Sequence, residues 1–245
     1  MKKLYIFVLL LLSFIVSYAQ PSIDTTGKLI EQKENIITES TVIKVENLGA
    51  LINTEYPEMR PTISADGDLL FFIRQGHPSN IQISTVPNAQ DIWYSTRYSA
   101  GNWSKAKHLN GSVNASHFNA VYWISPDLNT ILLKGAFREG QYLGTGVSII
   151  RRMEDNSWSP AQMLRIRNFN KFAFTSQLGA SMGQDGKTML FYMTDKKESF
   201  DNDLYVSFLE GGDIWTAPKS KRKKINLPNY NEMSPFIAAD GVTLY

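Results

Sequence analysis

Residues 91–106 read DIWYSTRYSAGNWSKA, and residues 203–218 read DLYVSFLEGGDIWTAP. In both stretches a tryptophan follows the opening aspartate by 12 residues and is itself followed by a serine or threonine. A weaker middle copy starts at Gly146-Val147-Ser148 and reaches Trp158 over the same distance. A constant offset in three copies indicates an internal repeat, the most informative feature of this chain.

A second landmark precedes each copy. It is a four-residue turn sequence with aspartate in its third position, followed by an apolar run. The four turns contain Asp66-Gly67, Asp127, Asp185-Gly186 and Asp240-Gly241, and their aspartates are 61, 58 and 55 residues apart. Aspartate bonds its own backbone and glycine tolerates positive φ, so each sequence predicts a tight hairpin turn.

The first unit predicts four short strands, at Pro61–Ser64, Leu69–Ile73, Asp91–Thr96 and Trp103–Leu109. Every residue of Leu69–Ile73 is apolar, which is typical of a strand buried on both faces. Four strands in about 55 to 60 residues, repeated, are typical of β-propeller blades; a stacked solenoid of sheets is the alternative. The predicted fold class is therefore all-β, a propeller of four-stranded blades.

The repeat region extends over residues 45–245. Its units are about 45–109, 110–164, 165–227 and a partial 228–245, which gives about three full blades plus parts of two. Tyr245 aligns with the middle of an expected strand. Closed propellers have about four to eight blades, so we expect an incomplete ring, either a fragment or a ring completed by other chains.

The composition excludes several classes of protein. The 245 residues are 43% hydrophobic, 12% aromatic and 20% charged, unlike a disordered tail, a fibre or a polytopic membrane protein. A net charge of +2 is too small for nucleic-acid binding driven by bulk charge. The chain has no cysteine, which excludes disulfides, cysteine-ligated zinc and a thiol nucleophile, and its three histidines leave little material for metal sites.

The first 19 residues predict a cleaved signal peptide. Lys2 and Lys3 precede the largely apolar run Leu4–Val16, and Ser17-Tyr18-Ala19 forms a small-x-small cleavage site. We therefore expect export to the periplasm or outer membrane, with cleavage after Ala19 and no transmembrane segment afterwards. Residues 20–44 are polar and weakly patterned and predict a linker or a loosely docked strand leading into the repeats.

The repeat resembles the WD-repeat-like, TolB-like propeller repeats of bacterial envelope proteins. The matching pattern is Glu-x-x-Pro-x-x-Ser-x-Asp-Gly, an apolar strand, Asp-Ile-Trp-x-Ser and Trp-Ser-x-Ala, close in the first unit, fair in the third and weak in the second. The resemblance implies an exported and non-enzymatic propeller of the type associated with OmpA-family proteins. Such propellers are often followed by an OmpA-like peptidoglycan-binding domain, which nothing in this sequence matches.

The recurrence of several polar and aromatic residues favours structural roles for them. The four turn aspartates could suggest metal ligands or a sialidase-type Asp box, but they recur once per unit beside turn residues. Asp91 and Asp203 open the third strand and could cap backbone amides or fix the junction between blades. Trp103, Trp158 and Trp215 recur at one position, so we expect packing between blades rather than a carbohydrate-stacking platform.

A cluster of positive charge interrupts the third unit. It comprises Lys219, Lys221, Arg222, Lys223 and Lys224. Trp215 and Leu227 are 12 residues apart, whereas the corresponding tryptophan and leucine are 6 apart in the other units. We therefore expect a solvated insertion loop that could contact an acidic partner or anionic lipid. We expect loops 75–90 and 219–224 to contribute to a binding face.

Three functions remain open. The first is an exported, non-catalytic propeller that acts as a protein-interaction scaffold in the cell envelope, with envelope proteins, including peptidoglycan-associated ones, as the expected partners. The second is a propeller glycoside hydrolase or the regulatory propeller of a hydrolase. The third is a carbohydrate- or peptidoglycan-recognition module. Nucleophile-elbow, P-loop and zinc-protease motifs do not occur in the sequence, so we predict no catalytic residues, no metal and no cofactor.

Overall fold

The computed structural model describes residues 45–81, 88–98, 101–109, 111–172, 178–194, 201–220, 225–228 and 230–245. The chain divides into two compact units, 1–45 and 46–245, and every described residue except Val45 belongs to the second. The predicted signal peptide and linker thus lie outside the described residues. None of the helices in the described ranges is long and apolar enough to cross a membrane.

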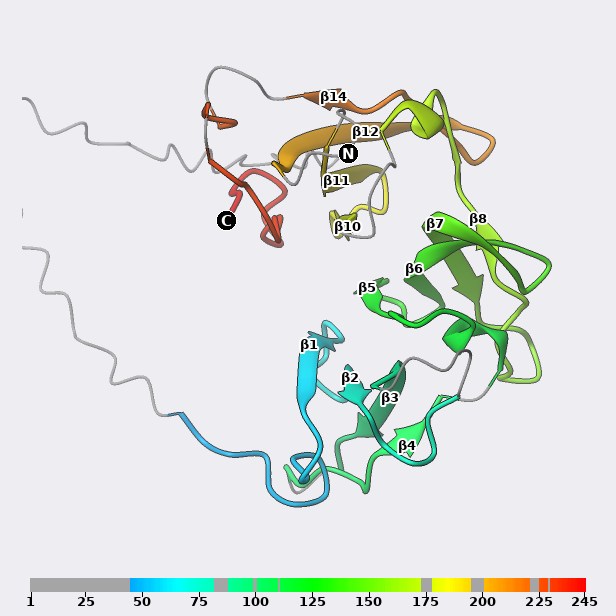
Figure 1. Ribbon diagram of the computed structural model, residues 1–245, viewed down its shortest axis with the longest axis vertical. Coiled ribbons are helices and arrows are strands. Elements are labelled where there is room, and N and C mark those ends of the chain that lie inside the picture. Colours follow the sequence, from blue (N-terminus) through cyan, green and yellow to red (C-terminus); the bar gives the residue numbers. More distant parts are fainter. Residues whose placement is uncertain are drawn as a thin grey trace, which may run out of the picture. The chain divides into compact units, whose positions relative to one another are not determined.

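The described part of the chain is all-β, and the predicted fold class is confirmed at this level. Its regular elements are strands apart from two single-turn 3-10 helices, Ser112–Asn114 and Phe169–Lys171. The strands form separate sheets, shown in Figure 1. Chain order follows spatial order throughout the first two sheets and in the first three strands of the third. Such meanders need only short connections between neighbouring antiparallel strands.

The first sheet is a four-stranded antiparallel meander. Its order is β1 (Glu58–Ile63), β2 (Leu69–Gln75), β3 (Gln90–Thr96) and β4 (Lys107–His108). The five apolar residues of β2 are buried or nearly so, because β2 lies between two strands and both of its faces are covered.

The second sheet repeats this arrangement. Its order is β5 (Val121–Ile124), β6 (Thr130–Arg138), β7 (Gln141–Arg151) and β8 (Gln162–Met163). The strands β6 and β7 are longer than their counterparts in the first sheet and are joined by a tight turn at Glu139-Gly140.

In the third sheet, two short strands take the place of a single fourth strand. Its order begins with β10 (Gly179–Met182), β11 (Thr188–Met193) and β12 (Asp203–Gly211). Two short strands, β13 (Ile214–Trp215) and β14 (Lys219–Ser220), both pair with β12, and β9 (Arg165–Ile166) adds to β13 in parallel. The sheet therefore has six strands rather than four, although its first three follow the same meander.

The fourth strand is broken in all three sheets, so the prediction of one continuous strand over Trp103–Leu109 is wrong. Trp103 makes a single bridge to Arg97, and β4 begins only at Lys107. The physical reason lies between these points: the hydroxyl of Ser104 accepts the amide of Thr96 at 3.1 Å. A side chain thus takes the backbone donor that a continuous ladder would use.

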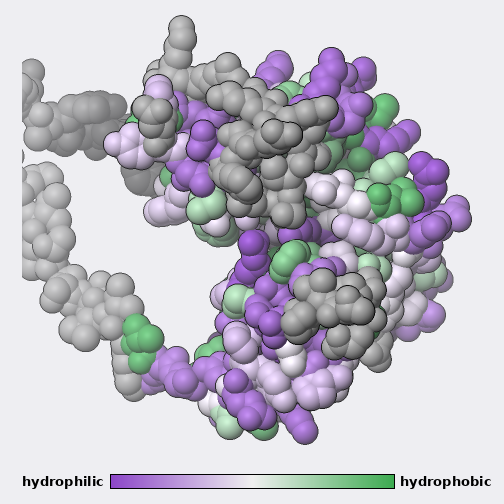
Figure 2. Space-filling model, viewed as in Figure 1, coloured by the Kyte–Doolittle hydropathy of each residue, from purple (hydrophilic) through white to green (hydrophobic). Residues whose placement is uncertain are grey.

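Hydrophobic clusters lie between successive sheets. Ile131 and Leu133 of β6 belong to a cluster that also contains Phe71 and Ile92 of the first sheet. The intervening Leu132 belongs to a cluster shared with the third sheet. Alternate residues of one central strand therefore bury against opposite neighbours, and all three are fully inaccessible to solvent. On the face shown in Figure 2, apolar residues are interspersed among hydrophilic ones.

Candidate functional site

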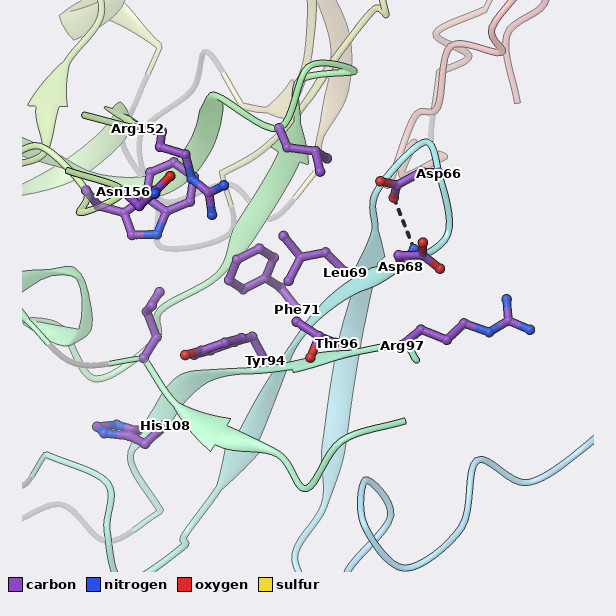
Figure 3. Close-up of a pocket in the computed structure, with 13 residues that line it drawn as sticks. Asp66, Asp68, Leu69, Phe71, Tyr94, Thr96, Arg97, His108, Arg152 and Asn156 are labelled. Carbon is purple, nitrogen blue, oxygen red and sulfur yellow. Dashed lines mark hydrogen bonds between the residues drawn. The ribbon is translucent and has the colours of Figure 1, made fainter. Parts of the chain in front are cut away.

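A cavity of about 570 Å³ lies between the first and second sheets. Figure 3 shows its lining. The first sheet supplies side chains from β2, β3, β4 and the turn before β2: Asp66, Asp68, Leu69, Phe71, Tyr94, Thr96, Arg97, His108 and Leu109. The second sheet supplies side chains from two of its turns: Leu128, Arg152, Asn156 and Trp158.

The floor of the cavity is aromatic and apolar. The rings of Phe71 and Tyr94 lie 5.9 Å apart, tilted by 40°. The guanidinium of Arg152 lies 5.3 Å from the ring centroid of Trp158, within cation–π distance. Figure 3 shows Arg152 pointing toward Phe71 and Tyr94, whereas Arg97 points away from them. The cavity can therefore accept a ring or aliphatic group whose anionic end reaches Arg152.

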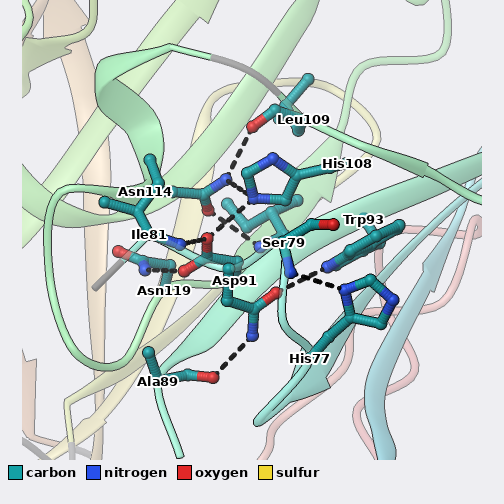
Figure 4. Close-up of polar contacts among 12 residues, drawn as sticks. His77, Ser79, Ile81, Ala89, Asp91, Trp93, His108, Leu109, Asn114 and Asn119 are labelled. Carbon is teal, nitrogen blue, oxygen red and sulfur yellow. Dashed lines mark hydrogen bonds and ion pairs between the residues drawn. The ribbon is translucent and has the colours of Figure 1, made fainter. Parts of the chain in front are cut away.

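His108 connects this cavity to a buried polar network, shown in Figure 4. Its Nε2 atom lies 2.7 Å from the carboxylate of Asp91, which is inaccessible to solvent. The same carboxylate accepts the amide of Ile81 at 2.7 Å and the side-chain amide of Asn119 at 3.4 Å. The structure thus places Asp91 against a backbone amide and against the segment that leads to the second sheet.

Part of the loop predicted at 75–90 is packed into the molecule rather than exposed. Asn80 is buried and donates to the carbonyls of Arg74 and Ala89, and it accepts the indole N–H of Trp93 at 3.0 Å. The ring of His77 stacks edge-on against Trp93 at 4.5 Å. Burial lowers the pKa of His77, with a smaller contribution from the charge of Arg74. Residues 82–87 lie outside the described residues.

The sequence reasoning missed Asn114 and Asn226, which occupy equivalent positions. The side-chain oxygen of Asn114 accepts the amide of Ile92 at 2.8 Å, and that of Asn226 accepts the amide of Leu204 at 2.9 Å. Both pairs are 22 residues apart in sequence. A gapless comparison of residues 90–119 with 202–231 aligns these two asparagines and would have revealed them.

The four predicted turns each use the aspartate carboxylate in the same way. Each carboxylate accepts the backbone amide two residues later, at 2.8 to 3.0 Å; the aspartates are Asp66, Asp127, Asp185 and Asp240. Hydrogen bonds from Ser64, Ser125 and Thr243 are the first cause of the lowered pKa of Asp66, Asp127 and Asp240, respectively. Within the described ranges, no group of three or more His, Asp or Glu side chains could hold a metal ion.

The residue after each turn aspartate has a positive φ, which explains why glycine occupies this position in three of the four turns. Gly67, Gly186 and Gly241 have φ of 77°, 63° and 68°. Leu128 takes this place in the second turn with φ 58°, which is uncommon for a leucine, and its side chain lines the cavity.

The three recurrent tryptophans do not come together. Trp215 is buried in the cluster between the second and third sheets, Trp158 packs against the cluster between the first and second, and Trp103 packs against a third cluster in the first sheet. Trp158 and Trp215 thus pack between sheets, whereas Trp103 packs within the first sheet, and Trp158 alone among the three lines the cavity.

One residue of the predicted basic loop, Lys219, is placed differently from the prediction. Lys219 lies in β14 opposite Val206, as Lys107 lies in β4 opposite Tyr94. Lys219 is therefore a strand residue and not part of an insertion loop, because the short fourth strand begins four residues after the tryptophan in both units. Lys221, Arg222, Lys223 and Lys224 lie outside the described residues. Asp203 is half-buried at the start of β12.

No family model matches the chain, and no curated protein matches it. Among solved structures, it is similar to a candidate 6-phosphogluconolactonase from Bacteroides uniformis, with 15% identity and a TM-score of 0.22. The similarity covers 56% of this chain and 50% of that chain, so it spans half the length of that structure. A similarity at this level does not establish a shared fold.

Proposed function

We propose that this chain is an exported, non-catalytic β-propeller of four-stranded blades that serves as a protein-interaction scaffold in the bacterial cell envelope. The cavity between the first two sheets is its recognition site for an apolar or aromatic side chain beside a carboxylate. The recurrent sequence pattern supports the TolB-like assignment, and the pattern of residues 1–19 supports export.

Three features support the propeller arrangement. The sheets begin with meanders of the same order, their first strands β1, β5 and β10 contact one another in sequence, and hydrophobic clusters fill the spaces between successive sheets. A further Asp-Gly turn at Asp240, bracketed by a bridge between Ile237 and Leu244, has the hairpin geometry of the other units. A solenoid would not require first strands to converge.

One contrast carries the scaffold proposal. The polar residues that recur from unit to unit are engaged in backbone hydrogen bonds, as at Asp127, Asn114 and Ser104. The cavity, in contrast, is lined by exposed polar side chains above an aromatic floor, among them Arg152 and Asn156. A cavity with this lining suits the binding of a partner protein through a few buried side chains.

Site-specific photocrosslinking in the native envelope tests this proposal. A benzophenone side chain at Asn156 should capture a discrete envelope protein, and the adduct should be lost on adding Arg152→Ala. A benzophenone at Lys187, an exposed residue of the turn before β11, is the matched control and should not capture it. Equal capture at both positions, or hydrolysis of glycoside substrates by the purified chain, would contradict a non-catalytic scaffold with this recognition site.

The aromatic lining favours carbohydrate recognition as a second candidate. Tyr94 and Trp158 offer rings of the kind that stack on sugars, and Asn156 offers an amide for hydroxyl groups. A glycan array separates the two functions: saturable glycan binding that Trp158→Ala abolishes would support this candidate. Photocrosslinked protein that excess glycan does not displace would support the scaffold.

A further inference from the structure

A second cavity, of about 380 Å³, lies between the second and third sheets. Its charged lining consists of three exposed arginines and one exposed carboxylate: Arg138, Arg151, Arg165 and Asp213. The cavity between the first and second sheets, in contrast, is lined by two arginines and two aspartates. The second cavity, called the arginine cavity below, therefore has an excess of positive charge that the first lacks.

Arg138 reaches the arginine cavity because the end of the β6–β7 hairpin folds back against β8. The amide of Gly140, in the turn after Arg138, donates to the carbonyl of Ala161 at 3.0 Å. The next residue, Gln162, pairs with Ile149 near the far end of β7, so this contact requires the hairpin to bend. The pairing of β6 with β7 shifts register twice near its end, which allows the bend.

The other two arginines meet at one turn of the third sheet. The Nη2 atom of Arg165 in β9 donates to the carbonyl of Gly212. The Nη2 atom of Arg151 in β7 lies 3.7 Å from the carboxylate of Asp213. Their acceptors belong to neighbouring residues, so the two guanidiniums lie close together although they come from different sheets. Each guanidinium has five N–H donors, so both retain donors for a ligand.

An apolar cavity of about 180 Å³ adjoins the arginine cavity, because Ile149, Arg151, Leu164 and Asp213 line both. The rest of its lining includes four side chains of the hydrophobic cluster between the second and third sheets: Trp123, Met182, Leu209 and Trp215. A ring or aliphatic group in this apolar cavity would be removed from water, while an anionic group attached to it could remain beside Arg151.

We propose that the arginine cavity and the apolar cavity together bind a small dianionic ligand with an apolar body, either a dicarboxylate or a phosphate monoester. Three guanidiniums and one carboxylate leave an excess of two positive charges, which a dianion neutralises. Arg151 and Arg165 supply planar pairs of donors that match the geometry of an oxyanion, and Arg138 supplies the third charge. The site depends neither on the scaffold function nor on the cavity between the first and second sheets.

Calorimetric titration of the purified chain at constant ionic strength tests the site with four probes. Phenylsuccinate and phenyl phosphate combine a dianion with a ring, and succinate and inorganic phosphate are the corresponding anions without the ring. We expect saturable binding of a phenyl probe, about tenfold tighter than that of its parent anion, because the ring is buried in the apolar cavity. The phenyl probe that binds more tightly identifies the oxyanion.

Substitutions at the charged residues should change the affinity in opposite directions. Arg138→Gln and Arg165→Gln should each lower the affinity about tenfold, because each removes a charge that the dianion neutralises. Asp213→Asn should raise the affinity severalfold, because it removes the carboxylate that competes for Arg151. Asparagine suits this position, since the φ of Asp213 is 61°.

A matched control separates this site from general attraction of anions. Arg167 is exposed, lines neither cavity and pairs with Glu210 at 2.8 Å, so Arg167→Gln should leave the affinity unchanged. Circular dichroism of each variant verifies folding. The proposal would be overturned by the absence of binding of all four probes at about 10 mM, by equal affinity in Arg138→Gln and Arg167→Gln, or by equal affinity of the phenyl probes and their parent anions.

Discussion

The Nε2 atom of His108 lies 2.7 Å from a carboxylate oxygen of Asp91, a residue with no solvent exposure. The pair joins β3 to β4, and the carboxylate also accepts the amide of Ile81. The buried Asp91 carboxylate thus connects three chain segments, so its removal should lower the free energy of unfolding.

Asp91→Asn should lower the free energy of unfolding by about 1 to 3 kcal/mol, because it removes the charge and places an amide donor among existing donors. Urea denaturation of the purified chain measures this loss. Asp68→Asn changes an exposed carboxylate of the same sheet and should alter stability by less than about 0.5 kcal/mol. Equal midpoints for the two variants would show that the buried network does not stabilise the fold.

The hydroxyl that follows each recurrent tryptophan should contribute according to its burial. Ser104 is buried and accepts the amide of Thr96 at 3.1 Å, whereas Ser159 is half-buried and accepts the amide of Arg151 at 3.0 Å. Ser104→Ala should lower the free energy of unfolding by about 1 to 2 kcal/mol, and Ser159→Ala by about 0.5 kcal/mol, because water can reach the amide of Arg151. Guanidinium denaturation of both variants provides the comparison, and a larger loss for Ser159→Ala would contradict this explanation.

The sequence predicted those elements whose determinants are local. Leu69–Ile73 and Asp91–Thr96 lie within β2 and β3, and a hairpin turn lies at Asp66. An apolar run and an Asp-Gly turn carry their own structural preferences, so these elements do not depend on distant contacts. The all-β class followed from their recurrence.

The features that the sequence did not predict depend on contacts between distant residues. The fourth strand is broken because the Ser104 hydroxyl competes for a backbone amide. Lys219 was placed in a loop because Leu227 was aligned with Leu109, whereas the pairing of β14 with β12 sets the register. The cavity exists only where two sheets pack together, so no single segment encodes it.

Gly179→Ala should be strongly destabilising. A Cβ at this position would lie 1.9 Å from the ring of Tyr192, whereas one at Gly186 would meet nothing within 4 Å. We expect Gly179→Ala to cost about 3 kcal/mol through overpacking. Gly186→Ala should cost about 1 kcal/mol, because only its positive φ is strained. Thermal unfolding measures both costs, and adding Tyr192→Leu should restore part of the loss at Gly179; failure of this rescue would place the strain elsewhere.

Lys134→Met should make the chain more stable at neutral pH. The pKa of Lys134 is lowered from 10.5 to about 8, first by burial and then by the charge of Arg60. The folded chain therefore carries this charge at a cost below pH 8, and the variant avoids that cost. Because part of the ammonium is still solvated, we expect a gain of about 1 to 2 kcal/mol at pH 7.

The pH dependence of that gain distinguishes the charge from packing. Between pH 8 and 10.5 the unfolded chain holds a proton on Lys134 that the folded chain has lost, so the stability of the unaltered chain rises with pH relative to the variant. Urea denaturation should therefore show that the free energies of unfolding of the unaltered chain and of Lys134→Met approach each other as the pH rises from 8 to 10.5. Lys107→Met, at an exposed lysine of β4, should show no such trend. A difference that stays constant with pH would assign the effect to the added apolar contacts instead.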